Sequence, residues 1–471
     1  MTPTPPERQA TREVTADLLA RHDRASPRYT SYPTAVEFDE QVNGAVAVAH
    51  LAAADELSDA PLSIYVHLPF CQTRCTFCGC HVIAAPDPDR AARPYLELLG
   101  EETALLARHL PHRRQVAQLH LGGGTPTYYS PEELTTLVSG LLESFRPTPE
   151  AEMALEVDPR VTTEEHIAAL AALGFNRISL GVQDFAAEVQ EAIGRPQSLA
   201  ETSRVIEWAR ARGFRGINID LIYGLPRQEP RGFEATMDSV IQLRPDRLAV
   251  YSFAYVPWVR GHQRRIPADW LPDREAKFEL LALARERLLG AGYEPIGMDH
   301  FALPEDELAL ARRAGRLRRN FQGYTVVPAD DVLALGISAI ADVRGGLFQN
   351  AKKLSRYREA LAAGRLPVEK GIVRSADDRI RADVIAALMC NGSVDIPQVE
   401  ADHSISFREY FARDLEDLRA AATEGLVVVE DHRIQATETG ELLIRNLAMC
   451  FDRYFREKHA GSTAPVFSRT V

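Results

Sequence analysis

The sequence lacks an excess of basic residues. Its 471 residues include 54 Lys and Arg against 66 Asp and Glu, which gives a net charge of −12 at pH 7. Nucleic acids bind basic surfaces through their phosphates, so this balance argues against a general affinity for DNA or RNA. A small anionic substrate is compatible with it, because a local group of arginines can outweigh the global charge.

Long apolar stretches are also missing. No part of the chain contains the run of about 18 apolar residues that a membrane-spanning helix needs. The first eight residues, MTPTPPER, are polar and proline-rich where a secretion signal would have an apolar core. We therefore predict a cytoplasmic protein without a membrane span.

Cysteine is scarce, and its distribution is uneven. Four of the six cysteines lie within ten residues, as Cys71, Cys75, Cys78 and Cys80. The first three have the spacing C-x3-C-x2-C, which suits a [4Fe–4S] cluster with three protein thiolates and one iron open to a small-molecule ligand. Zinc is an alternative, although it prefers paired C-x2-C knuckles or added His ligands. A disulfide is a second alternative, disfavoured in a chain without a secretion signal.

The length predicts roughly two to four domains. We divide the chain into an N-terminal strap and helical extension (1–60), an α/β domain with an extension (61–374) and a C-terminal helical domain (375–471). Within the first part, a helix is predicted at about 13–22. Pro27 and Pro33 then hold the next segment extended, either as a surface strap or as a segment that covers a ligand.

Apolar periodicity alternates between strand and helix through the middle of the chain. Strands are predicted at 64–68, 115–121, 153–157, 177–182, 216–222 and 247–252, and helices at 95–109, 131–145, 164–173, 199–212, 232–243 and 272–290. Six β-then-α units indicate a parallel sheet, either doubly wound or curled into a full or partial barrel. The polar segment 318–325 is predicted as a loop.

Polar and glycine motifs follow these strands. The cysteines come after the first strand and GGGTPT (122–127) after the second, while Glu156, Gln183, Asp220 and Ala254 stand at the ends of the next four. Ligands bind at the carboxyl ends of parallel strands in α/β proteins. We therefore expect these motifs to surround one site.

The C-terminal part has a different pattern. Helices fit 377–390, 396–402, 407–424 and 438–454, with two short strands at 426–429 and 433–437. This order suggests a winged-helix-like module. Winged helices often bind DNA, so one non-enzymatic hypothesis is a metal-sensing regulator. Residues 375–471 carry eleven basic and seventeen acidic residues, however, and a net charge of −6 disfavours contact with DNA phosphates.

The C-x3-C-x2-C motif resembles that of the radical S-adenosylmethionine (SAM) superfamily. A larger set of motifs resembles the oxygen-independent coproporphyrinogen III oxidase family: RYTSYPT (28–34), YVHLPFC (65–71), FCGC (77–80), GGGTPT (122–127), EVDP (156–159), GMDHF (297–301), NFQGYT (320–325) and FSR (467–469). The match runs from about residue 24 to the end. The chain departs from the family at His81 and Leu121, neither of which is a cluster ligand there.

This resemblance implies a fold and an activity. The fold is a partial (β/α)6 radical-SAM barrel with extensions, plus the helical C-terminal domain. The activity is oxidative decarboxylation of the ring A and B propionates of coproporphyrinogen III to vinyl groups, giving protoporphyrinogen IX in haem biosynthesis. A low-potential electron donor such as flavodoxin or ferredoxin, and a monomeric state, are implied as well. The first alternative is a related radical-SAM protein that binds or transfers haem and does not decarboxylate.

The resemblance also assigns residues. One [4Fe–4S] cluster would be held by Cys71, Cys75 and Cys78. Two SAM molecules would be contacted by Tyr65, Phe77, Gly123, Gly124, Thr125, Glu156, Gln183, Arg195, Asp220, Ala254 and Ile340. Catalytic roles are implied for Tyr65, Glu156 and Asp220.

Several residues have a plainer interpretation from residue type alone. Arg195 would be a surface arginine, and Cys390 and Cys450 would be core residues of apolar helices. By spacing Cys80 is a candidate fourth ligand, but the family leaves it off the cluster. Arg28, Arg318 and Arg319 are either counter-charges for the substrate carboxylates or solvated arginines.

Overall fold

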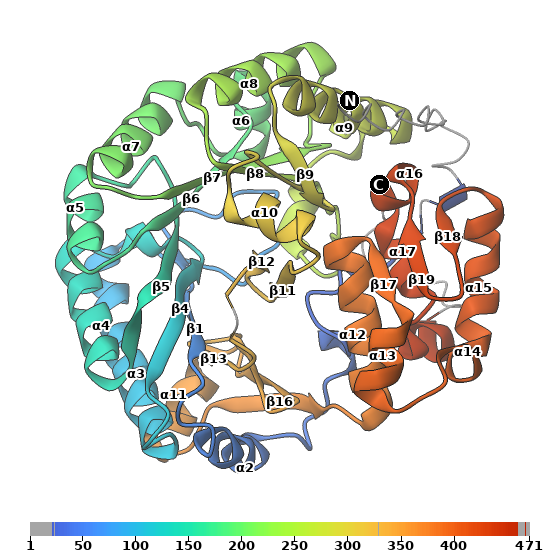
Figure 1. Cartoon of the computed structure of the whole chain (residues 1–471). Coiled ribbons are helices and arrows are strands. Elements are labelled where there is room, and N and C mark those ends of the chain that lie inside the picture. The colour runs from blue at the N-terminus through green and yellow to red at the C-terminus, as the bar shows by residue number, and fades with distance from the viewer. Residues whose placement is uncertain (1–20, 23, 328, 460–466, 468–471) are drawn as a thin grey trace, which may run out of the picture.

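The computed structural model describes residues 21–22, 24–327, 329–459 and 467. One 12-stranded sheet curves through most of it, with helices along its outer side and a mostly helical region at one flank (Figure 1). The strand order is β16-β15-β14-β13-β1-β4-β5-β6-β7-β8-β10-β9. Most of the helix predicted at 13–22 and most of the FSR motif lie outside the described residues.

Six parallel strands form the centre of this sheet. They are β1 (Leu62–Leu68), β4 (Gln115–Gly123), β5 (Arg146–Val157), β6 (Arg177–Gln183), β7 (Gly216–Tyr223) and β8 (Arg247–Ser252). The helices that follow them are α3 (Pro88–His109), α4 (Pro131–Ser144), α5 (Glu164–Ala172), α6 (Ala187–Ile193) with α7 (Leu199–Ala211), α8 (Pro230–Leu243) and α9 (Arg274–Gly290). The six predicted βα units and the partial barrel are therefore confirmed.

Local sequence explains where these helices begin. Ser130 Oγ accepts a hydrogen bond from the Glu133 amide, and the Glu133 carboxylate accepts one from the Ser130 amide. Pro131 supplies a preset φ at the first turn of α4. Ser198 and Glu201 form the same capping box at α7. These caps fix where α4 and α7 begin to run back along the sheet, after the segments that follow β4 and β6.

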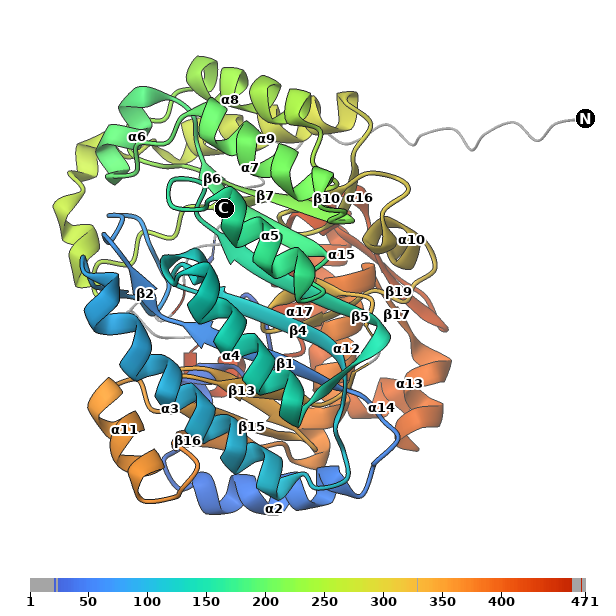
Figure 2. The same cartoon turned by 90° about the vertical axis from the view of Figure 1, so that its left-hand side faces the viewer.

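Both edges of the sheet extend beyond the predicted units. On one side β13 (Val332–Leu335) pairs parallel with β1, and β14 (Ile340–Val343), β15 (Gly346–Asn350) and β16 (Val368–Val373) add antiparallel strands. This extension packs against α2 (Gly44–Asp55), and α11 (Leu354–Ala362) packs against α3. On the other side β10 (His300–Ala302) and β9 (Glu294–Gly297) close the sheet, followed by α10 (Glu307–Arg313). Figure 2 shows α2, α11 and β16 below the parallel strands.

Three predicted elements were wrong. The helix predicted at 407–424 is broken into α14 (Phe407–Tyr410) and α15 (Ala412–Thr423), because the chain leaves helical geometry at Phe411. Segment 318–325 is a hairpin of β11 (Arg318–Asn320) and β12 (Gly323–Thr325), not a loop; strands of three residues are too short to show a periodicity of two. The long helix predicted at 438–454 is broken into α16 (Glu438–Leu442) and α17 (Ile444–Met449), because the chain leaves helical geometry at Leu443.

The C-terminal region is mostly helical, as predicted. It contains α12 (Ala376–Asn391), α13 (Ile396–His403), α14 (Phe407–Tyr410) and α15 (Ala412–Thr423), with a small sheet of β17 (Ser393–Asp395), β19 (Arg433–Ala436) and β18 (Val427–Val429). Its apolar core is separate from that of the barrel and includes Tyr29 and Tyr32 of the N-terminal strap. Cys390 is buried in a neighbouring small core, which confirms the prediction for this cysteine. Cys450 is half-buried, packs against the C-terminal core and follows the end of α17, so it is not a core residue inside a helix. The domain boundaries themselves stay a prediction.

Candidate active site

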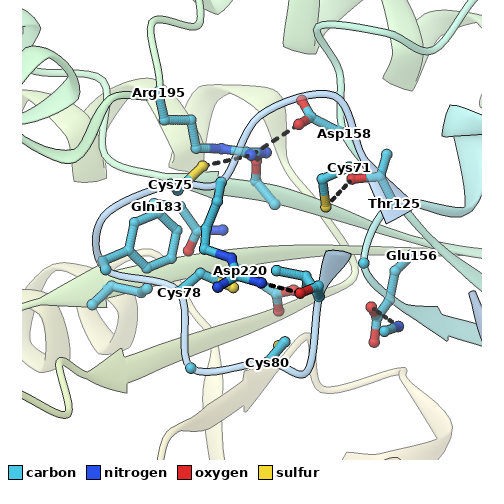
Figure 3. Close-up of a pocket in the computed structure, with 18 of the residues that line it drawn as sticks. Cys71, Cys75, Cys78, Cys80, Thr125, Glu156, Asp158, Gln183, Arg195 and Asp220 are labelled. Atoms are coloured by element: carbon cyan, nitrogen blue, oxygen red, sulfur yellow. Dashed lines mark hydrogen bonds and ion pairs between the residues drawn. The ribbon is translucent and has the colours of Figure 1, made fainter. Parts of the chain in front are cut away.

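The carboxyl ends of the parallel strands surround one cavity of about 680 Å³ (Figure 3). Its wall includes four cysteines and nine of the residues implied as cofactor contacts. These nine are Phe77, Gly123, Gly124, Thr125, Glu156, Gln183, Arg195, Asp220 and Ala254. The expectation that the strand-end motifs meet at one site is therefore confirmed.

The cysteine loop connects β1 to α3. Its base is closed by a short parallel pairing of β2 (Phe70–Cys71) with β3 (Ile83–Ala84), and the Ile83 amide donates to the carbonyl oxygen of Pro69 at 2.8 Å. Cys71 Sγ lies 3.2 Å from Thr125 Oγ1, which joins the loop to the residue after the glycine run. Cys71, Cys75 and Cys78 therefore face one cavity from a single loop.

The thiols have different electrostatic surroundings. Burial raises the pKa of Cys71 to about 11. A hydrogen bond from Cys80 lowers the pKa of Cys78 to about 7, against the opposing effect of burial, and Arg260 and Arg74 act in the same direction. Among the described residues, no three His, Cys, Asp or Glu side chains gather closely enough to hold a single metal ion.

The glycine run has a packing role. A Cβ on Gly123, whose φ is +115°, would lie 2.5 Å from the ring of His67, and a Cβ on Gly124 would lie 2.6 Å from the carbonyl of Pro69. Contacts this short are not tolerated, so glycine is required at both positions. The run therefore lets the end of β4 lie directly against the start of the cysteine loop.

Arg195 is buried in the cavity wall, so the prediction of a surface arginine from residue type was wrong. Its Nη1 donates to Asp158 Oδ2 at 2.9 Å and lies 3.9 Å from Cys75 Sγ, and its Nη2 donates to the carbonyl oxygen of Gly181 at 2.7 Å. Arg160, which sequence reasoning missed, also binds Asp158, at 2.6 Å. Burial alone would raise the pKa of Asp158, but the two guanidinium groups hold it below its usual value.

Two carboxylates on neighbouring walls of the cavity differ in their surroundings. Glu156 accepts a hydrogen bond from the Gly123 amide at 3.0 Å and lies 3.5 Å from His120 Nε2. Against the effect of burial, His120 and the Gly123 amide lower the pKa of Glu156. Sequence reasoning missed His120. It lies on β4, where alternate side chains point into the barrel, three residues before Gly123.

Asp220 has the opposite shift. It accepts hydrogen bonds from Asn218 Nδ2 at 2.8 Å and Ser179 Oγ at 3.0 Å. Burial, and next the negative charge of Glu156, nevertheless raise its pKa to about 6. The site thus holds one carboxylate whose pKa is lowered, Glu156, and one whose pKa is raised, Asp220.

Two of the implied contacts lie elsewhere. Tyr65 does not line the cavity; its hydroxyl lies 3.1 Å from His67 Nδ1 and its ring stacks on His120 at 5.9 Å. A Cβ on Gly122 would touch both Tyr65 and Glu156, so Tyr65 stands just behind the carboxylate. Ile340 is half-buried on β14 and is likewise outside the residues that line this cavity.

The candidate substrate arginines are separated. Arg28 lines the cysteine cavity, forms an ion pair with Asp299 and lies 5.6 Å from the ring centre of Tyr251. Arg318 and Arg319 instead line a second cavity, of about 420 Å³, between the strap, the hairpin and α12. Only Arg28 therefore faces the cysteines.

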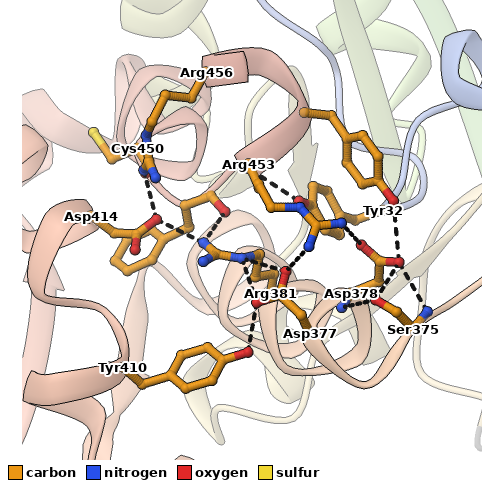
Figure 4. Close-up of polar contacts among 12 residues, drawn as sticks. Tyr32, Ser375, Asp377, Asp378, Arg381, Tyr410, Asp414, Cys450, Arg453 and Arg456 are labelled. Atoms are coloured by element: carbon orange, nitrogen blue, oxygen red, sulfur yellow. Dashed lines mark hydrogen bonds and ion pairs between the residues drawn. The ribbon is translucent and has the colours of Figure 1, made fainter. Parts of the chain in front are cut away.

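Three arginines of the C-terminal region, Arg381, Arg453 and Arg456, are paired with carboxylates (Figure 4). Arg381 donates to Asp414 at 2.7 Å and to Asp377 at 2.9 Å, and Arg456 donates to the same Asp414 at 2.7 Å. These groups tie α12 and α15 to the end of the chain. Their charge is neutralised inside the protein, which is the opposite of what a phosphate-binding surface needs.

Comparison with known proteins identifies the family. A model described as the radical SAM superfamily matches residues 65–240, and one described as the HemN C-terminal domain matches residues 375–443. The oxygen-independent coproporphyrinogen III oxidase of Pseudomonas aeruginosa is 44% identical over 93% of this chain and 95% of its own length. That of Escherichia coli is 43% identical over 96% and 98%.

The chain belongs to the oxygen-independent coproporphyrinogen III oxidase family. A solved structure of the coproporphyrinogen III oxidase of Escherichia coli, described as a radical SAM enzyme, agrees in fold with a TM-score of 0.87 and 43% identity, covering 90% of this chain and 97% of that one. The predicted family, superfamily and fold class are confirmed. Within the described ranges, none of the helices has the length and apolar character to cross a membrane.

Family membership implies a [4Fe–4S] cluster and SAM, and the residues present fit them. Three thiols from one loop line the same cavity, and soft thiolates are the usual ligands of iron–sulfur clusters. In the same wall, the buried Nε of Arg195 has no hydrogen-bond partner among the described residues. A buried donor without a partner is costly, and an anionic group of a bound ligand would satisfy it.

Proposed function

We propose that this protein converts coproporphyrinogen III to protoporphyrinogen IX in haem biosynthesis. Each of the ring A and B propionates would lose one hydrogen atom to the radical that SAM cleavage supplies, one CO2, and one electron to an external one-electron acceptor, and so become a vinyl group. The observation that carries the proposal is the similarity of nearly the whole chain, in sequence and fold, to named coproporphyrinogen III oxidases, with a three-thiol loop at the mouth of the barrel.

We assign cluster binding to Cys71, Cys75 and Cys78. All three thiols line the cavity, and the short pairing at the base of the loop holds their backbone in place. Cys80 is exposed and hydrogen-bonded to Cys78, so we give it no ligand role. The open iron would then face the cavity, where SAM can reach it.

The remaining wall suits the parts of SAM. Arg195 supplies a cationic donor for the carboxylate, through the Nε that the protein leaves unsatisfied. Glu156 and Asp220 are acceptors for the amine or the ribose hydroxyls, and Phe77 packs beside Val189 and Phe253 as an apolar surface for the adenine. The other assigned contacts are Gly123, Gly124, Thr125, Gln183 and Ala254.

Tyr65 and Ile340 fit a second SAM molecule better than the first. Tyr65 lies behind Glu156, and Ile340 lies on β14. Neither residue lines the cysteine cavity. Two SAM sites, with catalytic roles for Tyr65, Glu156 and Asp220, are therefore part of the proposal. Glu156, held ionised by His120 and the Gly123 amide, would keep a cationic group oriented at the boundary between the two sites.

The chemistry of hydrogen abstraction belongs to the cofactors, which when bound supply a one-electron cleavage of SAM. The protein's contribution is positioning. Arg28 faces the same cavity and is the candidate anchor for a propionate carboxylate, in exchange for its present partner Asp299. We further propose a low-potential electron donor such as flavodoxin or ferredoxin, a monomer and a cytoplasmic location.

The alternatives are less well supported. A haem-binding or haem-transferring relative is not favoured by similarity to named oxidases over almost the full length. A regulator is not favoured by the net charge of −6 over residues 375–471 or by the internally paired arginines of that region.

An anaerobic assay with reconstituted protein, SAM, coproporphyrinogen III and dithionite tests the proposal. Protoporphyrinogen IX and two molecules of CO2 per substrate are expected. SAM cleavage without any vinyl product would overturn the assigned substrate. The Cys75→Ala variant is the control, in which neither SAM cleavage nor product should appear.

A further inference from the structure

The outer side of the cysteine loop is covered by two segments from distant parts of the chain. His262 Nε2 donates to the carbonyl oxygen of Cys78 at 2.9 Å, and Gln263 Nε2 donates to that of Phe77 at 2.9 Å. On the other side His81 Nε2 donates to the carbonyl oxygen of Lys352 at 2.9 Å. Figure 2 shows β2 between two elements: the yellow-green segment that follows β8 on one side, and α11 on the other.

These three segments are strongly basic. Residues 69–86, 251–266 and 351–358 contain no Asp or Glu and eight Arg or Lys: Arg74, Arg260, Arg264, Arg265, Lys352, Lys353, Arg356 and Arg358. The chain as a whole has twelve more acidic than basic residues, so the local balance is the reverse of the global one. We call these residues, with Trp258 and Val259, the basic face.

Most of these charges are available to a partner. All eight are exposed except Arg260, which is half-buried, and within the described ranges only Arg356 forms an ion pair, at 4.0 Å from Glu369. Glu369 also accepts from the Lys352 amide at 3.5 Å, and Asp87 and Glu359 directly follow two of the three segments in the sequence. The charges act together, because Lys370 and Arg260 add to burial in lowering the pKa of Lys352.

An apolar contact point lies inside the basic face. Trp258 is 49% exposed and Val259 is 61% exposed, directly before Arg260. An exposed tryptophan next to arginines is the composition found at the energetic centre of protein interfaces. The basic face therefore combines positive charges with an exposed apolar contact at Trp258 and Val259.

The chemistry of the site requires a partner here. Each SAM cleavage consumes one electron, which must come from another molecule through the cluster. The carbonyl oxygens of Phe77 and Cys78 accept hydrogen bonds from Gln263 and His262, so the backbone of the cysteine loop lies directly against the segment that carries Arg260 and Arg264. A carrier bound on this face would stand next to the cluster without entering the substrate cavity.

We propose that the basic face docks a small acidic protein that carries one electron at low potential. This inference rests on the proposed function, since it uses the cluster held by Cys71, Cys75 and Cys78. In the docked complex the carrier loses one electron and the cluster gains it, with no bond made or broken. Complementary charge steers association and fixes the orientation, and salt weakens both effects.

Charge reversal tests the inference. Arg264→Glu with Lys353→Glu removes two exposed charges of the face, and Arg146→Glu with Arg215→Glu is the matched control. The control residues are exposed at the starts of β5 and β7, the opposite ends of the strands from the cysteines, and the change in net charge is the same. Each reconstituted enzyme is reduced under anaerobic conditions by reduced flavodoxin, reduced [2Fe–2S] ferredoxin or dithionite, and the cluster bleaching and SAM cleavage are followed.

The basic-face variant should be reduced by the carriers at least about 10-fold more slowly than wild type at low salt, and the difference should shrink at high salt. Dithionite should act equally on all three proteins. Equal carrier rates in all three, or a wild type that neither carrier reduces, would overturn the inference. Failure of dithionite to support SAM cleavage in wild type would instead refute the proposed function.

Discussion

Arg195 donates a hydrogen bond to Asp158 at 2.9 Å, and both side chains are buried in the wall that holds Cys75. We predict that Arg195→Ala lowers the free energy of unfolding by roughly 1–3 kcal/mol, because a buried carboxylate loses one of its two cationic partners. Urea unfolding of the cofactor-free protein measures this. The matched control is Arg160→Ala, which removes the more exposed partner of the same carboxylate and should cost less.

Arg195→Lys sharpens this prediction. Lysine keeps the charge but replaces the planar guanidinium, whose two nitrogens bind Asp158 and Gly181, with a single ammonium and has no Nε–H, so we expect partial recovery of stability and little recovery of SAM binding. Equal SAM affinity in Arg195→Lys and wild type would contradict the role assigned to the guanidinium group.

Asp220 should make the protein less stable as the pH rises. Its pKa in the folded state, about 6, lies above the ordinary value of 3.8, so the folded protein binds the extra proton between about pH 4 and 6. The free energy of unfolding therefore falls as the pH rises through that window. In Asp220→Asn this fall should be absent, because asparagine does not ionise. We expect the variant to be roughly 1–3 kcal/mol more stable than wild type at pH 7.5 and equal to it near pH 4.

Thermal or urea unfolding at three pH values checks this expectation, together with SAM binding at pH 7.5, which should weaken. A stability difference between Asp220→Asn and wild type that does not change with pH would refute it. Ser179→Ala is the control, since it removes one hydrogen bond to the carboxylate and leaves the charge in place.

We predict that three of the four clustered cysteines bind the cluster and that Cys80 does not. Replacement of Cys71, Cys75 or Cys78 by Ala is expected to abolish the brown [4Fe–4S] absorbance after anaerobic reconstitution, whereas Cys80→Ala should retain it. Iron and sulfide counts on all four variants provide the measurement. A loss of iron that is the same in all four would contradict the three-ligand assignment.

A buried carboxylate on α3 should hold the segment that leads to Ile340. Glu102 accepts hydrogen bonds from the Gly336 amide at 2.7 Å, Asn350 Nδ2 at 2.7 Å and Tyr357 Oη at 2.5 Å. Glu102→Ala leaves these donors unsatisfied, so we predict a loss of roughly 2–4 kcal/mol in the free energy of unfolding.

The neighbouring residue provides the control for this prediction. Glu101 is exposed on the same helix, and Glu101→Ala should change stability by less than about 0.5 kcal/mol. Glu102→Gln keeps the shape and part of the hydrogen bonding and should fall between the two. Equal unfolding midpoints for Glu101→Ala and Glu102→Ala would show that the buried network contributes nothing.

The features predicted correctly from sequence are local ones. The spacing of Cys71, Cys75 and Cys78 and the alternation of six strands with six helices can be recognised within short windows, because side-chain direction repeats every 2 or 3.6 residues. Parallel strands then place their carboxyl ends together, which is why Glu156 and Asp220 could be expected at one site. Short elements such as β11 and β12 offer too few residues for such a pattern.

The sequence by itself determined the cysteine motif, the βα order and the family that its motifs resemble. Only the tertiary structure decided that Arg195 is buried against Asp158, 37 residues earlier in the chain. Only it brought Arg74, Arg260 and Lys352 onto one face, through hydrogen bonds between segments more than 180 residues apart. The physical reason is that burial, pairing and local charge density depend on which distant segments pack together, and no short window of sequence contains that information.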